Sequence, residues 1–518
     1  MADSSRTRNS FINMLASAMA NIASVLLGII ARRYFVLILG DEMQGLNGLY
    51  TNVISMLSVV ELGMGSAIIY NLYKPIEQDD KETIRSLMAF YRRGYHIIGF
   101  IVAAIGLRII PILPFFVKEV TVDINATVVY LFFLADAVFS YFLSYKRSIF
   151  YAKQENYIVQ IIHIICLTIM KIVQTIILYI TRNYYLYLAI MVLLRVIENV
   201  VITYEVIRKY PDLSDKGANP ISEDIKRDIF LKIRGLFFHQ IGAFVVNGTD
   251  NLVITRILGL VTAGLYSNYA LIIEAIRNLS KQVIEAVTPS VGNLLVTADK
   301  DKQYDVFNKL RFINFWMAAF CGICLYVLMA PWVVIWIGES RLLPDFVMLV
   351  LAFNFFQKTM RNVYLSFKTA AGIFHEDRIV PVLEALINIT ISVILAKTIG
   401  LVGVFIGTTL SGLVLWCYSY PKFVYNGLFG RSIKDYCKET ISYILVFFGL
   451  LVITSLAASV VKIDNAYLNL LGKLLVCLIV PNVIIIILYH KTDNFRYCLA
   501  TADRLIYKVA KIHLFDKE

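Results

Sequence analysis

The chain has 518 residues, of which 58% are hydrophobic and 17% charged, and its formal net charge is +12. A soluble domain has about 45–50% apolar and about 25% charged residues, so this composition excludes an ordinary water-soluble fold. The excess of Lys and Arg could suggest a nucleic-acid partner, but these residues form short clusters between long apolar segments. Such clusters orient membrane spans and contact anionic headgroups, so we expect membrane lipids and no nucleic acid as partners.

Apolar segments long enough to cross a bilayer, which takes about 20 residues per helix, follow one another along the chain. Breaks at polar, Gly and Pro clusters predict about fourteen transmembrane helices and a basic tail, and therefore an all-α polytopic membrane protein. The expected spans are 9–39, 44–73, 82–110, 122–152, 155–181, 184–210, 224–258, 261–296, 303–337, 343–371, 377–398, 401–426, 433–460 and 467–490.

The charges between the spans alternate in sign. Connections after even-numbered spans are basic, for example Lys146, Arg147 and Lys153, whereas those after odd-numbered spans are acidic or nearly bare, for example Asp41 and Glu42. Cytoplasmic connections of membrane proteins are enriched in Lys and Arg. We therefore expect the even connections and both termini to be cytoplasmic.

The two halves of the chain carry a common pattern. Leu39-Gly40 and Gly45-Leu46 recur as Leu258-Gly259 and Gly264-Leu265, at a shift of 259 − 40 = 219 residues. Tyr50 and Asp80 meet Tyr269 and Asp299 at the same shift, and Glu155 meets Glu376 two residues later in register. Chance similarity between apolar segments would not place Gly, Tyr and Asp in the same order, so the pattern indicates an internal repeat.

The repeat predicts the domain organisation. Each copy holds six spans, an even number, so both copies cross the membrane in the same sense, as parallel repeats of transporters do. We expect two parallel six-helix lobes at 1–210 and 223–426, a cytoplasmic linker at 211–222, two additional helices within 427–490 and a tail at 491–518.

The sequence shows no signature of an enzyme. It has no P-loop and no loop long enough to hold a soluble catalytic module. The seven cysteines are scattered, and the Cys321/Cys324 pair stands in an apolar helix without a second pair or a nearby His, so we expect buried thiols rather than a zinc site. We expect no catalytic residue, no metal and no cofactor, and an ion gradient, the membrane potential or the substrate gradient as the energy source.

Three stretches resemble a known family. They are Arg32 to Leu46, Glu61-Leu62-Gly63-Met64-Gly65-Ser66-Ala67, and Asp250-Asn251-Leu252-Val253-Ile254 with the Gly259 and Gly264 motif that follows. Together with the twelve-plus-two spans, they resemble Wzx-type oligosaccharide flippases of the multidrug/oligosaccharidyl-lipid/polysaccharide exporter superfamily. The resemblance implies a bacterial cytoplasmic membrane protein that moves an undecaprenyl-pyrophosphate-linked oligosaccharide to the outer leaflet for capsule, exopolysaccharide or other envelope polymers. A polysaccharide polymerase complex would then be a partner.

Cations inside the spans are the candidates for binding the pyrophosphate, because a guanidinium matches phosphate oxygens with two parallel hydrogen bonds. Arg32 and Arg33 lie near the outer end of the first span, where snorkelling to the interface is the competing explanation. Lys171 lies near the middle of the fifth span, and Lys358 and Arg361 share one face of the tenth.

Carboxylates inside the spans have two competing roles. Glu61, Asp136 and Asp250 could bind a coupling ion, either Na⁺ or H⁺, or form ion pairs with the arginines. The pairs Arg195/Glu198 and Glu274/Arg277 have the three-residue spacing that lets each neutralise itself on one helix face. For the lone histidines, His163 and His239, we expect packing roles.

The expected mechanism is alternating access by the two lobes, with the charged headgroup inside a wet cavity and the lipid tail in the bilayer. Three alternatives remain open from the sequence. A drug or metabolite antiporter of the same superfamily would have a cavity of carboxylates and aromatic residues with few arginines. A membrane glycosyltransferase or polymerase would need a large outer loop. A scaffold without transport activity would tolerate neutralisation of every charge in the spans.

Overall fold

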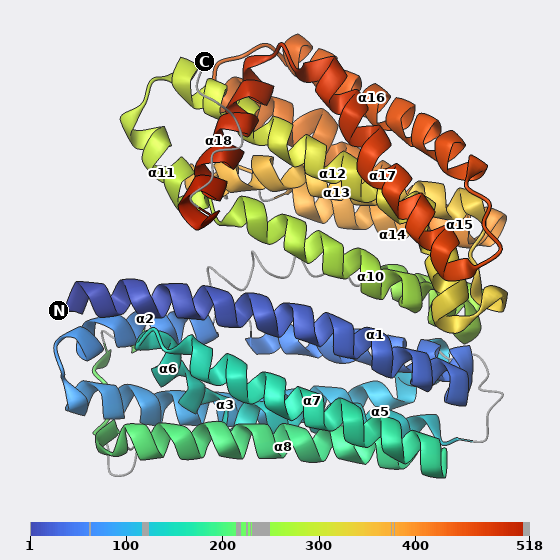
Figure 1. Ribbon diagram of the computed structural model, residues 1–518. Coiled ribbons are helices and arrows are strands. Elements are labelled where there is room, and N and C mark those ends of the chain that lie inside the picture. Colours follow the sequence, from blue (N-terminus) through green and yellow to red (C-terminus); the bar gives the residue numbers. More distant parts are fainter. Residues whose placement is uncertain are drawn as a thin grey trace. The chain divides into compact units, whose positions relative to one another are not determined.

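The computed structural model describes residues 2–61, 64–116, 124–213, 219–223, 226–227, 229, 249–373, 376–377 and 379–510, and all regular structure in these ranges is helical. Helices α1 (Ala2–Leu57), α2 (Met64–Glu77), α3 (Lys81–Ile109), α5 (Ala126–Phe142), α7 (Asn156–Thr181) and α8 (Tyr184–Lys209) come first (Figure 1). After a helical segment at 249–258, the chain continues through α10 (Leu260–Glu285), α11 (Thr288–Thr297), α12 (Lys300–Ile337), α13 (Asp345–Ala370), α14 (Val380–Ile399), α15 (Leu401–Val414), α16 (Ile433–Val460), α17 (Ala466–Tyr489) and α18 (Asp493–Ala510).

The expected fold class, an all-α polytopic membrane protein, is confirmed. Among the described residues, nine helices are long and apolar enough to cross a membrane, or ten if a bent pair counts as one span. The bent pair is α5 with the segment Ser144–Ala152, which turns by 48° and lies within the expected span 122–152. Several expected spans do not stand as separate long apolar helices. The continuous helix α1 contains the first expected span and half of the second, and the short helix α2 contains most of the rest of the second. The helices α10 and α13 carry several charged residues. Of the expected span 224–258, most lies outside the described residues.

The repeated glycines share a conformation. Gly40 has φ = +84° and breaks α1, and Gly259 has φ = +91° just before α10. Glycine adopts positive φ at little cost, whereas a residue with a Cβ atom does not. The sequence motif at 39–46 and 258–265 therefore marks the same backbone break in both halves.

Two other repeated residues also play equal roles. Tyr50 is buried and donates its hydroxyl hydrogen to the carbonyl of Ala126, at the start of α5. Tyr269 is buried and donates to the carbonyl of Arg341, four residues before α13 begins. Asp80 caps α3 by accepting from the amide of Thr83, as Asp299 caps α12 by accepting from the amide of Lys302. Local structure thus follows the 219-residue repeat at each of these positions.

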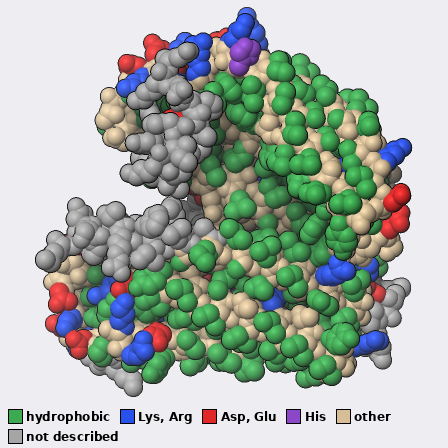
Figure 2. All heavy atoms as spheres, viewed as in Figure 1, with side chains coloured by type: hydrophobic (Ala, Val, Ile, Leu, Met, Phe, Trp, Pro, Cys, Tyr) green, Lys and Arg blue, Asp and Glu red, His purple; other side chains and the backbone are tan. Residues whose placement is uncertain are grey.

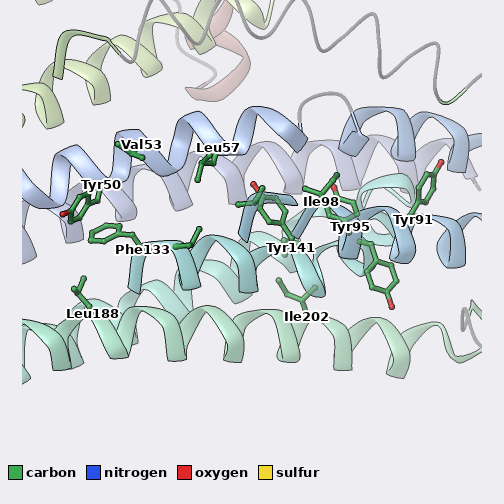
Figure 3. Packing of buried hydrophobic residues seen from close by; sticks show 14 of the residues in the cluster. Tyr50, Val53, Leu57, Tyr91, Tyr95, Ile98, Phe133, Tyr141, Leu188 and Ile202 are labelled. Carbon is green, nitrogen blue, oxygen red and sulfur yellow. The ribbon is translucent and has the colours of Figure 1, made fainter. Parts of the chain in front are cut away.

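The chain forms two compact units, Met1–Ser267 and Asn268–Glu518, with the boundary inside α10. The first unit has a continuous apolar core, in which side chains of α1, α3, α5 and α8 meet; Figure 3 shows Tyr50, Phe133, Tyr141 and Leu188 among them. In the second unit α12, α13 and α16 pack through stacked aromatic rings such as Phe315 on Tyr443.

The segment 211–222, expected to be a linker, has buried residues in its described parts. Leu213 and Ile221 are buried in the core of the first unit. Lys81, at the start of α3, binds Asp212 at 2.8 Å, and Asp212 lies outside the membrane-spanning segments. This contact lowers the pKa of the Asp212 carboxyl below its usual range, so this group stays charged around neutral pH.

Hydrophobic side chains cover most of the face seen in Figure 2, and charged side chains gather mainly toward the helix ends. Large apolar residues such as Ile165, Ile172 and Tyr179 on α7 are exposed in the isolated chain. In water these would be patches that seek a partner, but in a bilayer they face the lipid acyl chains. Each unit is therefore built to be solvated by lipid along its length.

Two glycines let α1 and α10 cross at very close range within the first unit. A Cβ atom on Gly45 would lie 2.0 Å from the carbonyl oxygen of Leu260, and one on Gly264 would lie 1.9 Å from that of Asp41. The 219-residue shift turns each of these contacts into the other, since 41 + 219 = 260 and 45 + 219 = 264. We call this crossing, formed by Asp41, Gly45, Leu260 and Gly264, the glycine crossing.

We predict that Gly45→Ala and Gly264→Ala each lower the melting temperature of the purified protein by several degrees. A glycine in a helix usually costs about 1 kcal/mol relative to alanine, so the substitution normally stabilises. Here the added methyl group must push two backbones apart, which costs about 1–3 kcal/mol. The matched control is Gly449→Ala in α16, where a Cβ atom meets nothing within 4 Å. Equal melting temperatures for all three variants in a thermal unfolding assay would contradict the close crossing.

Candidate functional site

A polar cavity of about 450 Å³ lies inside the first unit. Ligand-binding cavities commonly have volumes of about 300–1,000 Å³, so a ligand the size of a few sugar rings fits this range. Its lining combines two carboxylates, two arginines, three tyrosines and four serines with a few apolar residues. These side chains come mainly from α1, α2, α3, α5, α8 and the bent segment after α5. The lining residues are Ile54, Ser58, Glu61, Gly65, Ile69, Tyr95, Asp136, Ala137, Ser140, Tyr141, Ser144, Arg147, Ser148, Tyr151 and Arg195.

Glu61 and Asp136 both line this cavity, so the structure brings two of the sequence-derived candidates together. Asp136 on α5 accepts a hydrogen bond from Nε of Arg195 on α8 at 3.1 Å. Glu61 accepts from the hydroxyl of Tyr95 at 3.1 Å. In the described part of the chain, no Lys, Arg or His nitrogen lies within 4 Å of the Glu61 carboxylate. Of the two carboxylates in the cavity lining, Asp136 therefore has an ion-pair partner there and Glu61 does not.

The ion pairs extend from the cavity wall into the neighbouring helices. Glu198 on α8 lies 3.7 Å from a guanidinium nitrogen of Arg195 and 3.9 Å from one of Arg147, and its Oε1 lies 3.2 Å from Nδ1 of His163. The expected Arg195/Glu198 pair thus exists, but Asp136 on another helix makes the shorter contact with Arg195. His163 faces a carboxylate rather than only apolar neighbours.

A second group of candidates lies on α1 and α7. Arg32 is half-buried and donates from Nη1 to the hydroxyl of Ser267 at 3.1 Å and to its carbonyl oxygen at 3.3 Å. Lys171 on α7 is half-buried within electrostatic range of Arg32, and in the described ranges no carboxylate lies within 4 Å of its ammonium group. The adjacent Arg33 is exposed. Two cations from different helices therefore share one region of the first unit.

The remaining candidates lie elsewhere. Arg361 on α13 is buried, and its Nη1 donates to Glu384 on α14 at 2.7 Å, so this cation is neutralised inside the second unit. Lys358 is half-buried on the same helix, and Asp250 is half-buried in the described helical segment 249–258. Glu274 and Arg277 form the expected ion pair on α10. His239 lies outside the described residues.

The sequence did not single out Arg147 as a site residue. It was placed in a cytoplasmic connection, but α5 ends at Phe142 and the chain continues through a 3₁₀ turn at Ser144–Arg147, so Arg147 lines the cavity. A signal was present in Ser140, Ser144 and Ser148, which recur every four residues and all reach the cavity. Hydroxyls at this spacing lie on one helix face and indicate a polar interior rather than a loop.

Elsewhere in the described chain, no group of three or more His, Cys, Asp or Glu side chains is placed to hold a metal ion. All seven cysteines are free thiols, and Cys166 and Cys477 are buried.

The fold is that of flippases and multidrug transporters of known structure. It matches the lipid II flippase MurJ in its inward closed conformation with a TM-score of 0.65 and 14% identity, covering 92% of this chain and 99% of that one. It matches an inward-facing multidrug resistance MATE family transporter of the MOP superfamily (TM-score 0.57, 16% identity, 76% and 91% covered) and the Vibrio cholerae MATE transporter VcmN (TM-score 0.54, 12% identity, 82% and 100% covered). These neighbours are transporters and flippases, and the fold that this chain shares with them is that of a multi-pass membrane protein.

A family model described as polysaccharide biosynthesis protein matches residues 10–294, more than half of the chain. The chain therefore belongs to the polysaccharide biosynthesis protein family, and the resemblance seen in its sequence motifs is confirmed. No curated protein matches the chain.

We predict that Asp136→Asn or Arg195→Gln alone destabilises the protein by about 1–3 kcal/mol, because each leaves a partly buried charge without its partner. The double variant should recover most of the loss, since it removes both charges. Thermal unfolding in detergent measures the effect. Lys209→Gln, which breaks an ion pair with Glu155 at the end of α8, is the matched control and should cost less than about 1 kcal/mol. If the double variant were less stable than both single variants, the two residues would not act as a pair.

Proposed function

We propose that this protein is a flippase that carries a lipid-linked oligosaccharide from the cytoplasmic to the outer leaflet of the bacterial cytoplasmic membrane, with both termini in the cytoplasm. The observation that carries the proposal is that α1 and α7 pack against each other and bring two cations, Arg32 and Lys171, within electrostatic range inside a lipid-solvated unit. Like charges repel in a medium of low dielectric constant, and an anion bound between them relieves that cost. A pyrophosphate headgroup supplies such an anion.

The family and the fold support the same substrate class. The family is one of polysaccharide biosynthesis, and one structural neighbour is a flippase of lipid II. Both descriptions concern glycan assembly at membranes, and a lipid-linked glycan is the form in which an oligosaccharide crosses a bilayer with its tail still in lipid. The product would be used for capsule, exopolysaccharide or another envelope polymer, and a polymerase complex would receive it.

The cavity suits the glycan portion of this substrate. Ser58, Ser140, Ser144 and Ser148 offer hydroxyls that both donate and accept, and Tyr95, Tyr141 and Tyr151 add aromatic rings. Sugars present many hydroxyl groups and apolar ring faces, and such a lining satisfies both. We propose that one or two sugar residues occupy the cavity while the pyrophosphate lies at Arg32 and Lys171.

We further propose transport by alternating access of the two halves of the repeat. An inside-negative membrane potential favours outward movement of an anion by about 2.3 kcal/mol per charge per 100 mV. Glu61, which has no charged partner among the described residues, is the candidate for a coupling Na⁺ or H⁺. Asp136 is engaged by Arg195 and is the weaker candidate.

The competing function is antiport of an organic cation, and the Glu61 carboxylate facing three tyrosines is the observation in its favour. Aromatic rings and a carboxylate together attract cations. The two arginines in the same lining oppose a cationic ligand, as do Arg32 and Lys171 in the same unit. Counterflow of a cationic dye in vesicles distinguishes the two, because only the antiporter would move it.

The test is flipping of an undecaprenyl-pyrophosphate-linked oligosaccharide in reconstituted vesicles. We expect Arg32→Ala and Lys171→Ala each to slow flipping about 10- to 100-fold, because each removes a charge-assisted bond to phosphate worth about 1.5–3 kcal/mol. Arg33→Ala, whose side chain is exposed, should stay within about threefold of the wild type.

Arg361→Ala serves as the second control. It removes the partner of buried Glu384, so we expect a lower melting temperature rather than a selective loss of flipping. Wild-type flipping rates in folded Arg32→Ala and Lys171→Ala proteins would overturn the assignment of the headgroup site.

A further inference from the structure

Ser267 lies close to both arms of the broken helix α1. Arg32, eight residues before the break at Gly40, donates to the Ser267 hydroxyl and carbonyl. Gly48, eight residues after the break, lies so close that a Cβ atom on it would be 3.9 Å from Cβ of Ser267. Ser267 belongs to α10. It therefore binds α1 before the break, through Arg32, and lies close to α1 after the break, at Gly48.

The same serine is connected to the glycine crossing. Its hydroxyl donates to the carbonyl of Gly264 at 2.8 Å while it accepts from Arg32. Gly264 in turn approaches the carbonyl of Asp41 on α1. A chain of contacts therefore leads from the Arg32 guanidinium through Ser267 to the point where the two backbones lie closest.

We infer that Ser267 is a latch: a phosphate group binding to Arg32 withdraws the guanidinium from Ser267 and loosens the glycine crossing between α1 and α10. This inference rests on the proposed function, since it takes the pyrophosphate of the lipid-linked substrate as the ligand of Arg32. It assigns a positioning role to a neutral residue that does not itself bind the substrate.

The chemistry favours the exchange of partners. Ser267 offers Arg32 two neutral acceptors, whereas phosphate oxygens carry charge and can accept two parallel bonds from one guanidinium, which adds ion-pair attraction to the hydrogen bonds. Both bonds to Ser267 come from Nη1, so turning this one nitrogen toward a phosphate breaks both together. Lys171 lies within electrostatic range of Arg32 and adds attraction for the incoming anion.

The crossing suits a two-state response. With backbone against backbone at Gly45 and Gly264, no side chain can rearrange to keep the contact as the helices separate. Packed contacts of this kind tend to be either formed or broken, and small shifts are amplified by them. Because α10 runs from the crossing to Glu285, beyond the boundary of the first unit, a change at Ser267 is carried along a continuous helix.

The test uses Gly48→Cys/Ser267→Cys in the full-length protein in vesicles. A Cβ–Cβ separation of 3.9 Å suits a disulfide, and the backbone carbonyl at position 267 still accepts from Arg32. Copper phenanthroline supplies the oxidant, which takes two electrons and two protons from the thiols, and mass spectrometry detects the peptide that joins positions 48 and 267. We expect rapid cross-linking without ligand, and at least fivefold slower cross-linking with undecaprenyl pyrophosphate in the vesicles.

Three further measurements decide the role of Arg32. With Arg32→Ala added, undecaprenyl pyrophosphate should no longer slow the cross-link. Undecaprenyl monophosphate tests whether one phosphate suffices, and slowing by either lipid that depends on Arg32 supports the latch. Oxidised Gly48→Cys/Ser267→Cys should lose flipping and regain it on reduction, because a closed crossing cannot open.

Ser267→Ala tests the hydroxyl without introducing a thiol. It keeps the carbonyl acceptor and should lower the apparent Kd for undecaprenyl pyrophosphate about three- to tenfold, since less must be broken on binding. The matched control is Ser280→Ala on the same helix, whose hydroxyl bonds only to Ile276 of its own helix and should leave binding unchanged.

The outcomes separate the latch from the flippase proposal. If undecaprenyl pyrophosphate binds, flipping depends on Arg32 and Lys171, but cross-linking is unaffected by the lipid, the latch is wrong and the flippase assignment stands. If the lipid neither binds nor is flipped with its glycan, the proposed function fails first. Slowing of the cross-link that persists in Arg32→Ala also overturns the latch, because the ligand would then act elsewhere.

Discussion

Charge inside hydrocarbon is the constraint on which this structure depends. Water is absent from the bilayer core, so each buried polar group must find its partner within the protein or in a wet cavity. The protein meets this constraint mostly by pairing. Asp136 with Arg195, Arg361 with Glu384 and Arg311 with Glu439 each join two helices through an ion pair. These pairs fix the relative register of the helices as well as neutralising charge.

Against this background, two cations of the first unit are informative. Lys171 on α7 lies within electrostatic range of Arg32 on α1, and Arg32 donates to the hydroxyl and carbonyl of Ser267. Two positive charges in one region of the spans favour an anionic ligand. The polar cavity of the same unit, with its hydroxyls and tyrosines, has the complementary character expected for sugars. One unit thus holds candidate sites for both parts of a lipid-linked glycan.

Much of the fold follows from the sequence because long apolar segments and their breaks are local signals. The repeat pairs Gly40 with Gly259 and Asp80 with Asp299 by position. In the structure both glycines have positive φ and both aspartates cap a helix, so the two halves agree. The ion-pair partners of the charged residues cannot be predicted from the sequence, because they depend on which helices pack together. Arg195 carries a plausible partner three residues away in Glu198, yet Asp136 from another helix approaches more closely. The sequence predicts Arg361 as part of an anion site, but Glu384 from another helix forms an ion pair with it.

The reciprocal contacts of the glycine crossing bear on the origin of the chain. In a dimer of one ancestral half, a single glycine would serve both contacts, and a single substitution would alter both at once. Once the halves are joined in one chain, each position changes independently. Gly48 and Ser267 are equivalent in the repeat (48 + 219 = 267) and face one another, and the counterpart of Arg32 is Asn251 (32 + 219 = 251). A serine and an arginine therefore stand on one side only of this contact, an asymmetry that two identical halves could not have.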